Sequence, residues 1–339
     1  MPIKNGLLTA FLTICLMFVS PIVVFARDLI PGGHNIGVEL KSDGLMISGT
    51  YDVKYENAVY NPNRDSDIKK GDLLVRVGSN KVEDLSGLLS VLKKDFEGRD
   101  SIDVTIVRNK QEQVKSLKLI KDEYGNIKTG LFIKEKVLGL GTLTYYDPVN
   151  MTYGSLGHEM VDTNFSPGVD LSFGTIYGSD VRQIKKSVNG KPGEKIASIN
   201  KKEILGEVNK NNRYGVYGTY TKGPSERLVL EVGIREDVKL GSAQIWTVVK
   251  DDKIEKFDIE IVGLKKQDKK DIKGISFRVV DKRLLNISNG IVAGMSGSPI
   301  VQDNKIIGAV THVLVDKVQY GHGIFIEWML EESDALVRS

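Results

Sequence analysis

The residues best suited to covalent chemistry form a short glycine-rich segment near position 296. Ser296 stands between Gly294 and Gly297. Glycines allow a sharp backbone turn at little steric cost and can leave backbone N–H groups pointing outward. A serine in such a turn can act as a nucleophile, and the amides of Gly294 and Ser296 can bind the oxyanion of an attacked carbonyl group. The segment predicts acyl-transfer chemistry, with a purely structural turn as the alternative.

A serine hydroxyl needs a base, and the chain contains four histidines: His34, His158, His312 and His322. His34 falls in an N-terminal loop. His312 and His322 follow the serine, which is the order of α/β-hydrolases. His158 precedes the serine and lies in a glycine-flanked turn. We therefore predict that His158 is the base, whereas an esterase of another fold would use His312 or His322.

Short strands must position these groups. Turn residues recur from residue 30 onward between runs rich in Val, Ile, Tyr and Thr. After Ser296 we expect a hairpin with strands at 299–301 and 306–311. The motif and its hairpin resemble the chymotrypsin-like peptidases, with Ser298 in place of a glycine. The resemblance implies a mainly β chain with a double β-barrel serine peptidase domain, whose mechanism needs no metal or organic cofactor.

A second unit is expected before the peptidase domain. Its elements, together with the segment IKKGDLLVRVG, resemble an α+β bacterial PDZ domain. Such domains bind an extended peptide at a strand edge, with loop amides holding the end of the peptide. The resemblance gives this role to Ile36, Gly37 and Val38, with an unliganded turn as the alternative. The expected elements are strands at 37–40, 44–48, 68–77 and 103–108 and a helix at 84–94.

The N-terminal segment is almost wholly apolar, with Lys4 as its only charge, and it predicts a signal peptide or membrane anchor. Cys15, the only cysteine, lies within it, so the exported part can form no disulfide and has no cysteine ligand or nucleophile. The predicted division is residues 1–26 for this segment, 27–123 for the PDZ domain, 124–145 for a linker and entry to the peptidase domain, and 146–339 for the peptidase domain.

The charge balance argues against a nucleic-acid partner. The 339 residues contain 47 Lys and Arg against 44 Asp and Glu, for a net charge of +3. A nucleic-acid-binding surface would need a concentrated basic patch, and no long run of like charge occurs. The length allows two domains, and the apolar fraction of 41% supports real cores.

Several motifs together resemble the stage IV sporulation protein B family, the PDZ-containing serine peptidases of spore-forming Firmicutes. These motifs are GSLGHEM, GMSGSPI, IGAVTHV, IEWML and LIPGG followed by IGV. The resemblance implies export across the forespore membrane into the intermembrane space. There the family cleaves a membrane-associated regulator of an intramembrane protease, which activates a sigma factor. It also implies self-cleavage near the N-terminus, between Arg27 and the first PDZ strand, and control by a peptide or self segment in the PDZ groove.

The resemblance also assigns a third catalytic group. Asp281, at the end of the run ISFRVVD, would orient His158 and stabilise its imidazolium form. A solvated carboxylate at a strand end is the structural alternative, and Asp170 and Asp180 are weaker candidates for the acid. The rival function is a PDZ adaptor whose protease-like domain is catalytically inactive.

Overall fold

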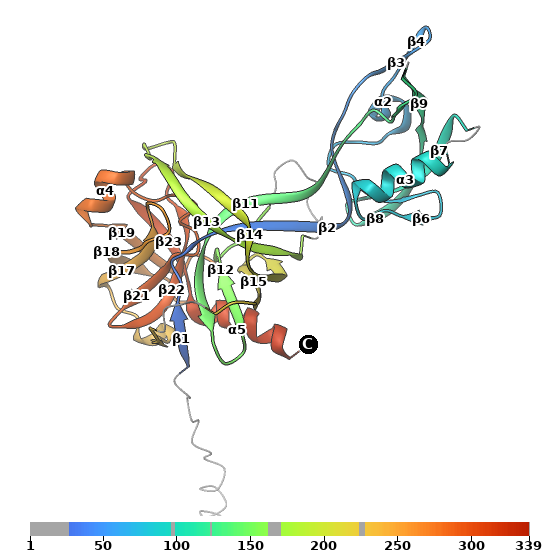
Figure 1. Cartoon of the computed structure of the whole chain (residues 1–339). Helices are drawn as coiled ribbons and strands as arrows, with labels where there is room; N and C mark the ends of the chain where they lie inside the picture. Colours follow the sequence, from blue (N-terminus) through green and yellow to red (C-terminus); the bar gives the residue numbers. More distant parts are fainter. Residues whose placement is uncertain (1–26, 96–98, 123, 162–170, 224–227, 339) are drawn as a thin grey trace, which may run out of the picture.

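The computed structural model describes residues 27–95, 99–122, 124–161, 171–223 and 228–338 (Figure 1). Strands make up most of this part, so the mainly β prediction is confirmed. The predicted signal or anchor segment, residues 1–26, lies outside the described residues. Within the described residues, no helix is both long and apolar enough to span a bilayer.

Six strands close a first barrel, because their antiparallel pairings form a complete cycle. β-branched and aromatic side chains such as Ile36, Ile176 and Tyr153 fill its interior. In order around the cycle the strands are β2 (Asn35–Thr50), β11 (Leu131–Asp147), β12 (Thr152–Ser155), β15 (Gly215–Tyr220), β14 (Gly193–Asn212) and β13 (Phe173–Lys185).

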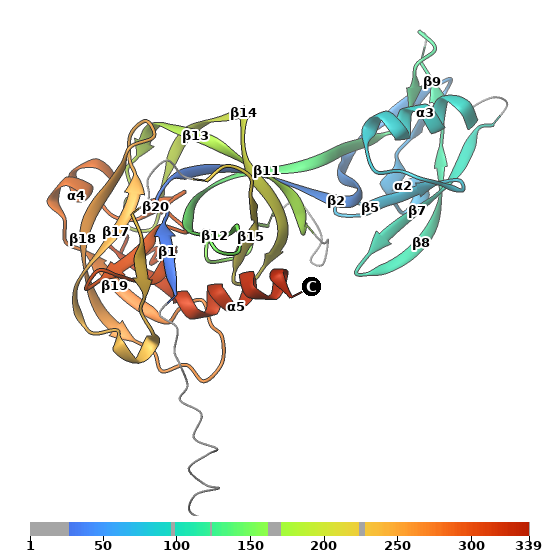
Figure 2. The ribbon, with the colours of Figure 1, turned by 60° about the horizontal axis from the view of Figure 1, so that its bottom comes forward.

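A second set of six strands closes a second barrel in the same way. Helix α5 (Ile326–Val337) adds Trp328 and Met329 to the core of this barrel and also packs along β12 and β15 of the first (Figure 2). The strands are β17 (Gly241–Val248), β18 (Ile254–Leu264), β19 (Ile275–Val279), β23 (Tyr320–Phe325), β22 (Lys305–Val313) and β21 (Pro299–Gln302).

Short strands join the two barrels. β1 (Asp28–Pro31) pairs with β11 on one side and with β16 (Leu230–Val232) on the other, and β16 also pairs with β22. β20 (Val292–Ala293) pairs in parallel with β14 of the first barrel. The described part of the barrels also contains the helical segments η1 (Arg235–Asp237) and α4 (Lys282–Ser288).

A smaller unit, residues 42–135, is inserted into the first barrel between the barrel halves of β2 and β11, and it stands apart from the barrels in Figure 1. The outer halves of these two long strands enter it, and it has a core of its own that includes Leu45, Leu74, Leu88 and Ile106. Its elements are β3 (Val53–Tyr55), β4 (Ala58–Tyr60), α2 (Pro62–Ser66), β5 (Leu73–Val77), β6 (Asn80–Lys81), α3 (Leu85–Asp95), β7 (Ser101–Arg108), β8 (Gln111–Lys118), β9 (Ile120–Lys121) and β10 (Ile127–Lys128).

The predicted peptide-binding role of Ile36, Gly37 and Val38 is wrong. These residues lie in the barrel half of β2, where they pair with β11 on one side and with β13 on the other. A peptide can add only to a strand edge that has no neighbour. Gly37 serves close packing instead, because a Cβ there would come within 2.6 Å of a methyl carbon of Ile199. The first barrel therefore includes residues that we expected in the PDZ domain.

Candidate active site

The segment around Ser296 forms a tight turn between β20 and β21. Gly294 and Gly297 have φ angles of +92° and +93°, in the left-handed region that favours glycine. A Cβ at Gly294 would come 3.2 Å from the side chain of Lys195, and one at Gly297 would come 2.0 Å from the carbonyl oxygen of Thr142. The backbone conformation therefore favours glycine at both positions, and close packing against the backbone requires it at Gly297.

Two backbone amides of this turn are available to a ligand. The amides of Met295, Gly297 and Ser298 donate to backbone carbonyl oxygens at 3.1, 2.7 and 3.0 Å. Within the described part of the chain, the amides of Gly294 and Ser296 have no such acceptor. These are the two donors that we predicted for the oxyanion, and the side chain of Ser296 is partly exposed beside them.

Strand β11 of the first barrel fixes the serine turn by hydrogen bonds. The amide of Thr142 donates to the carbonyl oxygen of Ser296 at 2.9 Å, and its hydroxyl donates to that of Gly294 at 2.8 Å. The hydroxyl of Thr144 donates to the carbonyl oxygen of Gly297 at 2.7 Å. The serine turn is therefore fixed at the junction of the two barrels.

The turn that carries His158 lies against the serine turn. Leu156 and Gly157, which precede the histidine, have φ angles of 64° and 68°. The amide of Leu156 donates to the carbonyl oxygen of Thr142, and a Cβ built on Gly297 would lie 2.5 Å from the nitrogen of Leu156. The structure thus brings the predicted base and the predicted nucleophile to the same junction.

The ring of His158 has a defined tautomer. Its Nδ1 lies 2.8 Å from the backbone carbonyl oxygen of Glu159, and a carbonyl oxygen can only accept, so Nδ1 carries the proton. Nε2 then keeps its lone pair and can act as a base. Burial lowers the pKa of His158, although the bond to the Glu159 carbonyl opposes this, and the imidazole is therefore neutral near pH 7.

The hydroxyl of Ser296 makes no hydrogen bond to this base among the described residues. Its Oγ donates to the carbonyl oxygen of Thr311 at 3.0 Å. If His158 is the base, as predicted, the side chain of Ser296 would have to rotate so that its hydroxyl proton points to Nε2. Catalytic hydrogen bonds are often loose in ligand-free enzymes and tighten only around a bound substrate.

An asparagine that has no sequence motif around it fixes the chain after His158. Asn211, which is buried at the end of β14, accepts from the amide of Met160 at 2.9 Å and donates to its carbonyl oxygen at 2.9 Å. Two hydrogen bonds to one residue hold that backbone segment in a single orientation. No sequence pattern indicates this role, because the partners are 51 residues apart.

The other two histidines near the site make no hydrogen bond to Ser296 within the described part of the chain. The ring of His312 lies 5.3 Å from that of His158, and burial together with the neighbouring charges lowers the pKa of His312 to about 4. His322 has its Nδ1 3.2 Å from the hydroxyl of Ser276. The esterase alternative, which needs one of them as the base for Ser296, therefore gains no support.

Asp281 makes no hydrogen bond or ion pair with His158 among the described residues, so the structure gives its predicted role as the acid no support. It is the N-cap of α4, where its carboxylate accepts from the amide of Arg283 at 2.8 Å and pairs with the guanidinium at 2.7 Å. Burial alone would raise the pKa of Asp281, but the bonds from Arg283 lower it on balance. Asp281 follows β19 by two residues and directly precedes α4, so its carboxylate caps the start of that helix.

The weaker candidates for the acid, Asp180 and Asp170, do not supply a carboxylate partner for His158 among the described residues either. Asp180 pairs with Arg182 at 3.4 Å on the exposed surface of β13. Asp170 lies outside the described residues. In this arrangement a backbone carbonyl, that of Glu159, is the group that orients His158.

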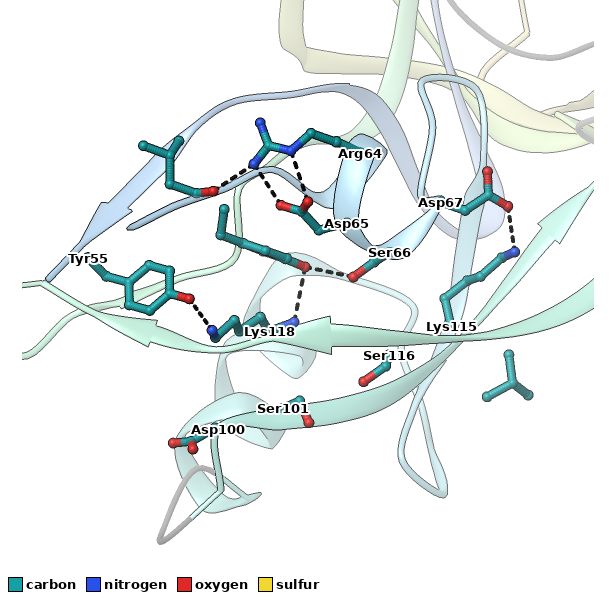
Figure 3. A pocket seen from close by; sticks show the side chains of 13 residues that line it. Tyr55, Arg64, Asp65, Ser66, Asp67, Asp100, Ser101, Lys115, Ser116 and Lys118 are labelled. Atoms are coloured by element: carbon teal, nitrogen blue, oxygen red, sulfur yellow. Dashed lines mark hydrogen bonds and ion pairs between the residues drawn. The ribbon is translucent and has the colours of Figure 1, made fainter. Parts of the chain in front are cut away.

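The junction that carries Ser296 and His158 and the inserted unit each have a cavity of their own. A hollow of about 440 Å³ beside His158 is lined mainly by apolar residues, among them Leu156, Met160 and Ile272. A larger hollow of about 790 Å³ lies in the inserted unit, where Lys115 points toward Asp67 and Lys118 toward Tyr55 (Figure 3). No cluster of three or more potential metal ligands occurs among the residues that the structure describes.

A family model described as SpoIVB peptidase S55 matches residues 125–330, more than half of the chain. The chain belongs to the SpoIVB peptidase S55 family. It is accordingly a serine peptidase of a sporulation family, as the motifs predicted. The matched range contains both turns of the site, whereas β1 and β2 lie before it.

Solved structures of the Rv3671c protease from M. tuberculosis are similar to this chain at 12% sequence identity. The active form covers 59% of this chain and 74% of that chain with a TM-score of 0.33. The inactive form covers 59% and 85% with a TM-score of 0.31. These TM-scores are too low to support a conclusion about the site. No curated protein matches the chain.

Proposed function

We propose that Ser296 is the nucleophile of this S55 peptidase and His158 its general base. Ser296 Oγ attacks a peptide carbonyl carbon while Nε2 of His158 accepts the hydroxyl proton, and the amides of Gly294 and Ser296 bind the resulting oxyanion. The imidazolium then gives its proton to the leaving amine. Water hydrolyses the acyl-enzyme by the same steps.

One observation carries this assignment. The two amides of the serine turn that lack an acceptor lie on the turn that abuts the His158 turn, and Thr142 bonds to both turns. A serine in a merely structural turn has no need of amides left without partners. Removal of one oxyanion donor typically lowers kcat by about a hundredfold to a thousandfold, so such a pair of amides is a substantial catalytic device.

For the biological role, we propose that the peptidase acts in the space between the two spore membranes. The apolar residues 1–26 would direct its export or anchor it. Its substrate would be a membrane-associated regulatory protein that inhibits an intramembrane protease, so that cleavage leads to sigma-factor activation. Membership of a sporulation peptidase family supports this role.

The inserted unit is proposed to be a PDZ domain that binds a peptide or a segment of the same chain. Its sheet and the helix α3, with Leu85 and Leu89 exposed, support this assignment. Self-cleavage is also proposed. The segment that begins at Arg27 is a poor site for it, because Leu29 and Ile30 of β1 are buried and β1 has a strand on each side.

The test compares wild type with Ser296→Ala and Ser298→Ala by labelling with a fluorophosphonate probe and by mass spectrometry of new chain termini. Ser298 is a matched control, because its hydroxyl is fully buried two residues away and has no partner among the described residues. We expect labelling and cleavage in wild type and Ser298→Ala and neither in Ser296→Ala. An unlabelled wild type that still binds a peptide through the inserted unit would favour the inactive adaptor instead.

A further inference from the structure

A lysine is buried directly beneath the serine turn. Lys195, on β14, has an exposed fraction of only 4%, and its neighbour Glu194 pairs with Ala293 of β20. Lysine is rarely buried this fully, because removing an ammonium group from water costs several kcal/mol unless it is paired. No carboxylate pairs with Lys195 within the described part of the chain, so its burial calls for another explanation.

The amine of Lys195 joins three strands from both barrels. Its Nζ lies 2.9 Å from the hydroxyl oxygen of Thr247 on β17, 3.4 Å from the side-chain oxygen of Asn35 on β2 and 3.5 Å from the hydroxyl oxygen of Thr142 on β11. An ammonium has three N–H groups for these three acceptors. A neutral amine can donate to Asn35 and Thr142 and accept from the Thr247 hydroxyl. The site therefore suits either protonation state.

Lys195 reaches the serine turn by two routes. The only proton of the Thr142 hydroxyl goes to the carbonyl oxygen of Gly294, so a lone pair of that hydroxyl is left to accept from Nζ. The aliphatic part of the lysine also packs under Gly294, where a Cβ would meet its carbons at 3.2–3.3 Å. The amine thus orients Thr142, and the side chain supports the turn directly.

We propose that Lys195 is a positioning residue that holds the oxyanion-binding turn in its productive conformation through Thr142. Thr142 fixes the carbonyl groups of Gly294 and Ser296, which flank the peptide plane that carries the Ser296 amide. With both flanking planes held, that amide faces outward. The inference rests on the proposed role of Ser296 and concerns how its oxyanion site is kept in place.

The first experiment replaces the amine with an apolar chain of similar length, Lys195→Met. We expect the second-order rate of fluorophosphonate labelling and the kcat for peptide cleavage to fall about tenfold to a hundredfold, with KM little changed, because the oxyanion forms only after attack. Lys185→Met is the control: this lysine of the adjoining strand β13 is exposed, and its only ion pair among the described residues is with Glu194. It should stay within about twofold of wild type.

The second experiment tests the hydrogen-bond route in case Lys195→Met does not fold, as judged by circular dichroism and thermal unfolding. Thr142→Val removes the hydroxyl, whereas Thr142→Ser keeps it. We expect Thr142→Val to lower kcat as Lys195→Met does and Thr142→Ser to recover most of the rate. Where both single variants fold, their combination should cost less than the product of the two separate effects, because they act on one chain of bonds.

The outcomes separate this inference from the proposed function. A folded Lys195→Met that is labelled at the wild-type rate, or a Thr142→Val as active as Thr142→Ser, would overturn the role of Lys195 while leaving Ser296 as the nucleophile. If wild type is not labelled at Ser296 at all, the proposed function fails first. A loss of stability with unchanged kcat would assign Lys195 to folding alone and would also overturn the inference.

Discussion

At the scale of single residues, the histidine is oriented by a carbonyl dipole where serine peptidases commonly use a carboxylate. The Glu159 carbonyl fixes the tautomer of His158, but a neutral dipole stabilises an imidazolium less than a full negative charge does. Fixing the tautomer of the histidine and stabilising its charged form are separate contributions to catalysis. In this site a backbone carbonyl group fixes the tautomer.

The pH dependence of labelling follows from the environment of His158. Burial lowers the pKa of His158, and the base must be neutral to accept the serine proton. We therefore expect the acidic limb of the labelling rate to lie below pH 6.5, the range of an unperturbed histidine. A pH series of fluorophosphonate labelling measures this limb. A midpoint above 6.5 would show that a negative charge approaches the ring in the active enzyme.

The role of Asp281 can be decided by one substitution. Asp281→Asn keeps a good N-cap for α4 and loses an ion pair with the mostly exposed Arg283, which costs roughly 1 kcal/mol or less. We expect kcat within a fewfold of wild type. A catalytic acid changed in this way would lower kcat by about ten-thousandfold, and a drop of that size would restore Asp281 to the triad.

The buried amine also predicts how stability changes with pH. Burial lowers the pKa of Lys195 to about 7 from the 10.5 of an exposed lysine, so between these values the unfolded chain binds a proton that the folded chain does not. The free energy of unfolding should therefore rise with pH from about 7 to 10.5, by roughly a few kcal/mol for this group. The measurement is urea unfolding across this range, with wild type compared to Lys195→Met. Equal slopes would contradict it.

At the scale of elements, local sequence patterns predict a strand or helix correctly where the residues that interact are close in sequence. The predicted hairpin after Ser296 forms as β21 and β22, and its turn residues Asp303 and Asn304 both adopt positive φ angles, as their residue types favour. The expected helix forms as α3, with the carboxylate of Asp84 accepting from the amide of Gly87. Ser296 and His158 can be proposed from the sequence for the same reason, because glycines mark both turns.

Contacts between distant segments could not be predicted. Asn35, Thr142 and Thr247 meet around Lys195 from positions spread over more than 200 residues. Each looks ordinary within its own strand. The role of Asp281 is hard to predict for the opposite reason, because a single carboxylate after a strand fits both a catalytic acid and an N-cap, and only the fold shows that it caps α4.

At the scale of the whole molecule, the chain leaves the first barrel and returns to it. β2 passes from the barrel into the inserted unit and β11 comes back beside it, so the barrel is completed only after residue 135. A domain boundary predicted in sequence order places β2 in the inserted unit, because its barrel partners β11 and β13 come about a hundred residues later. The paired strands β2 and β11 run without interruption from the barrel into the inserted unit.

The insertion predicts that the barrels can fold without the smaller unit. Lys41 of β2 faces Lys136 of β11, so residues 42–135 could be replaced by an Asn-Gly turn that joins the strands as a hairpin. We expect the shortened chain to label at Ser296, with reduced stability because Met46 and Leu73 of the inserted unit extend the first barrel's core. Probe labelling and thermal unfolding measure the two effects. A folded but unlabelled product would show that the inserted unit is needed to activate the site.

The position of β1 has a consequence for reach. Arg27, just before this strand, is held by Asp147 and Asp334, and β1 itself is locked between β11 and β16. If residues 1–26 remain in the membrane as an anchor, almost no free chain would separate the anchor from the folded barrels. The active site would then stay at a nearly constant distance from the bilayer. Substrates would be selected by the distance of their scissile bond from the membrane as well as by sequence.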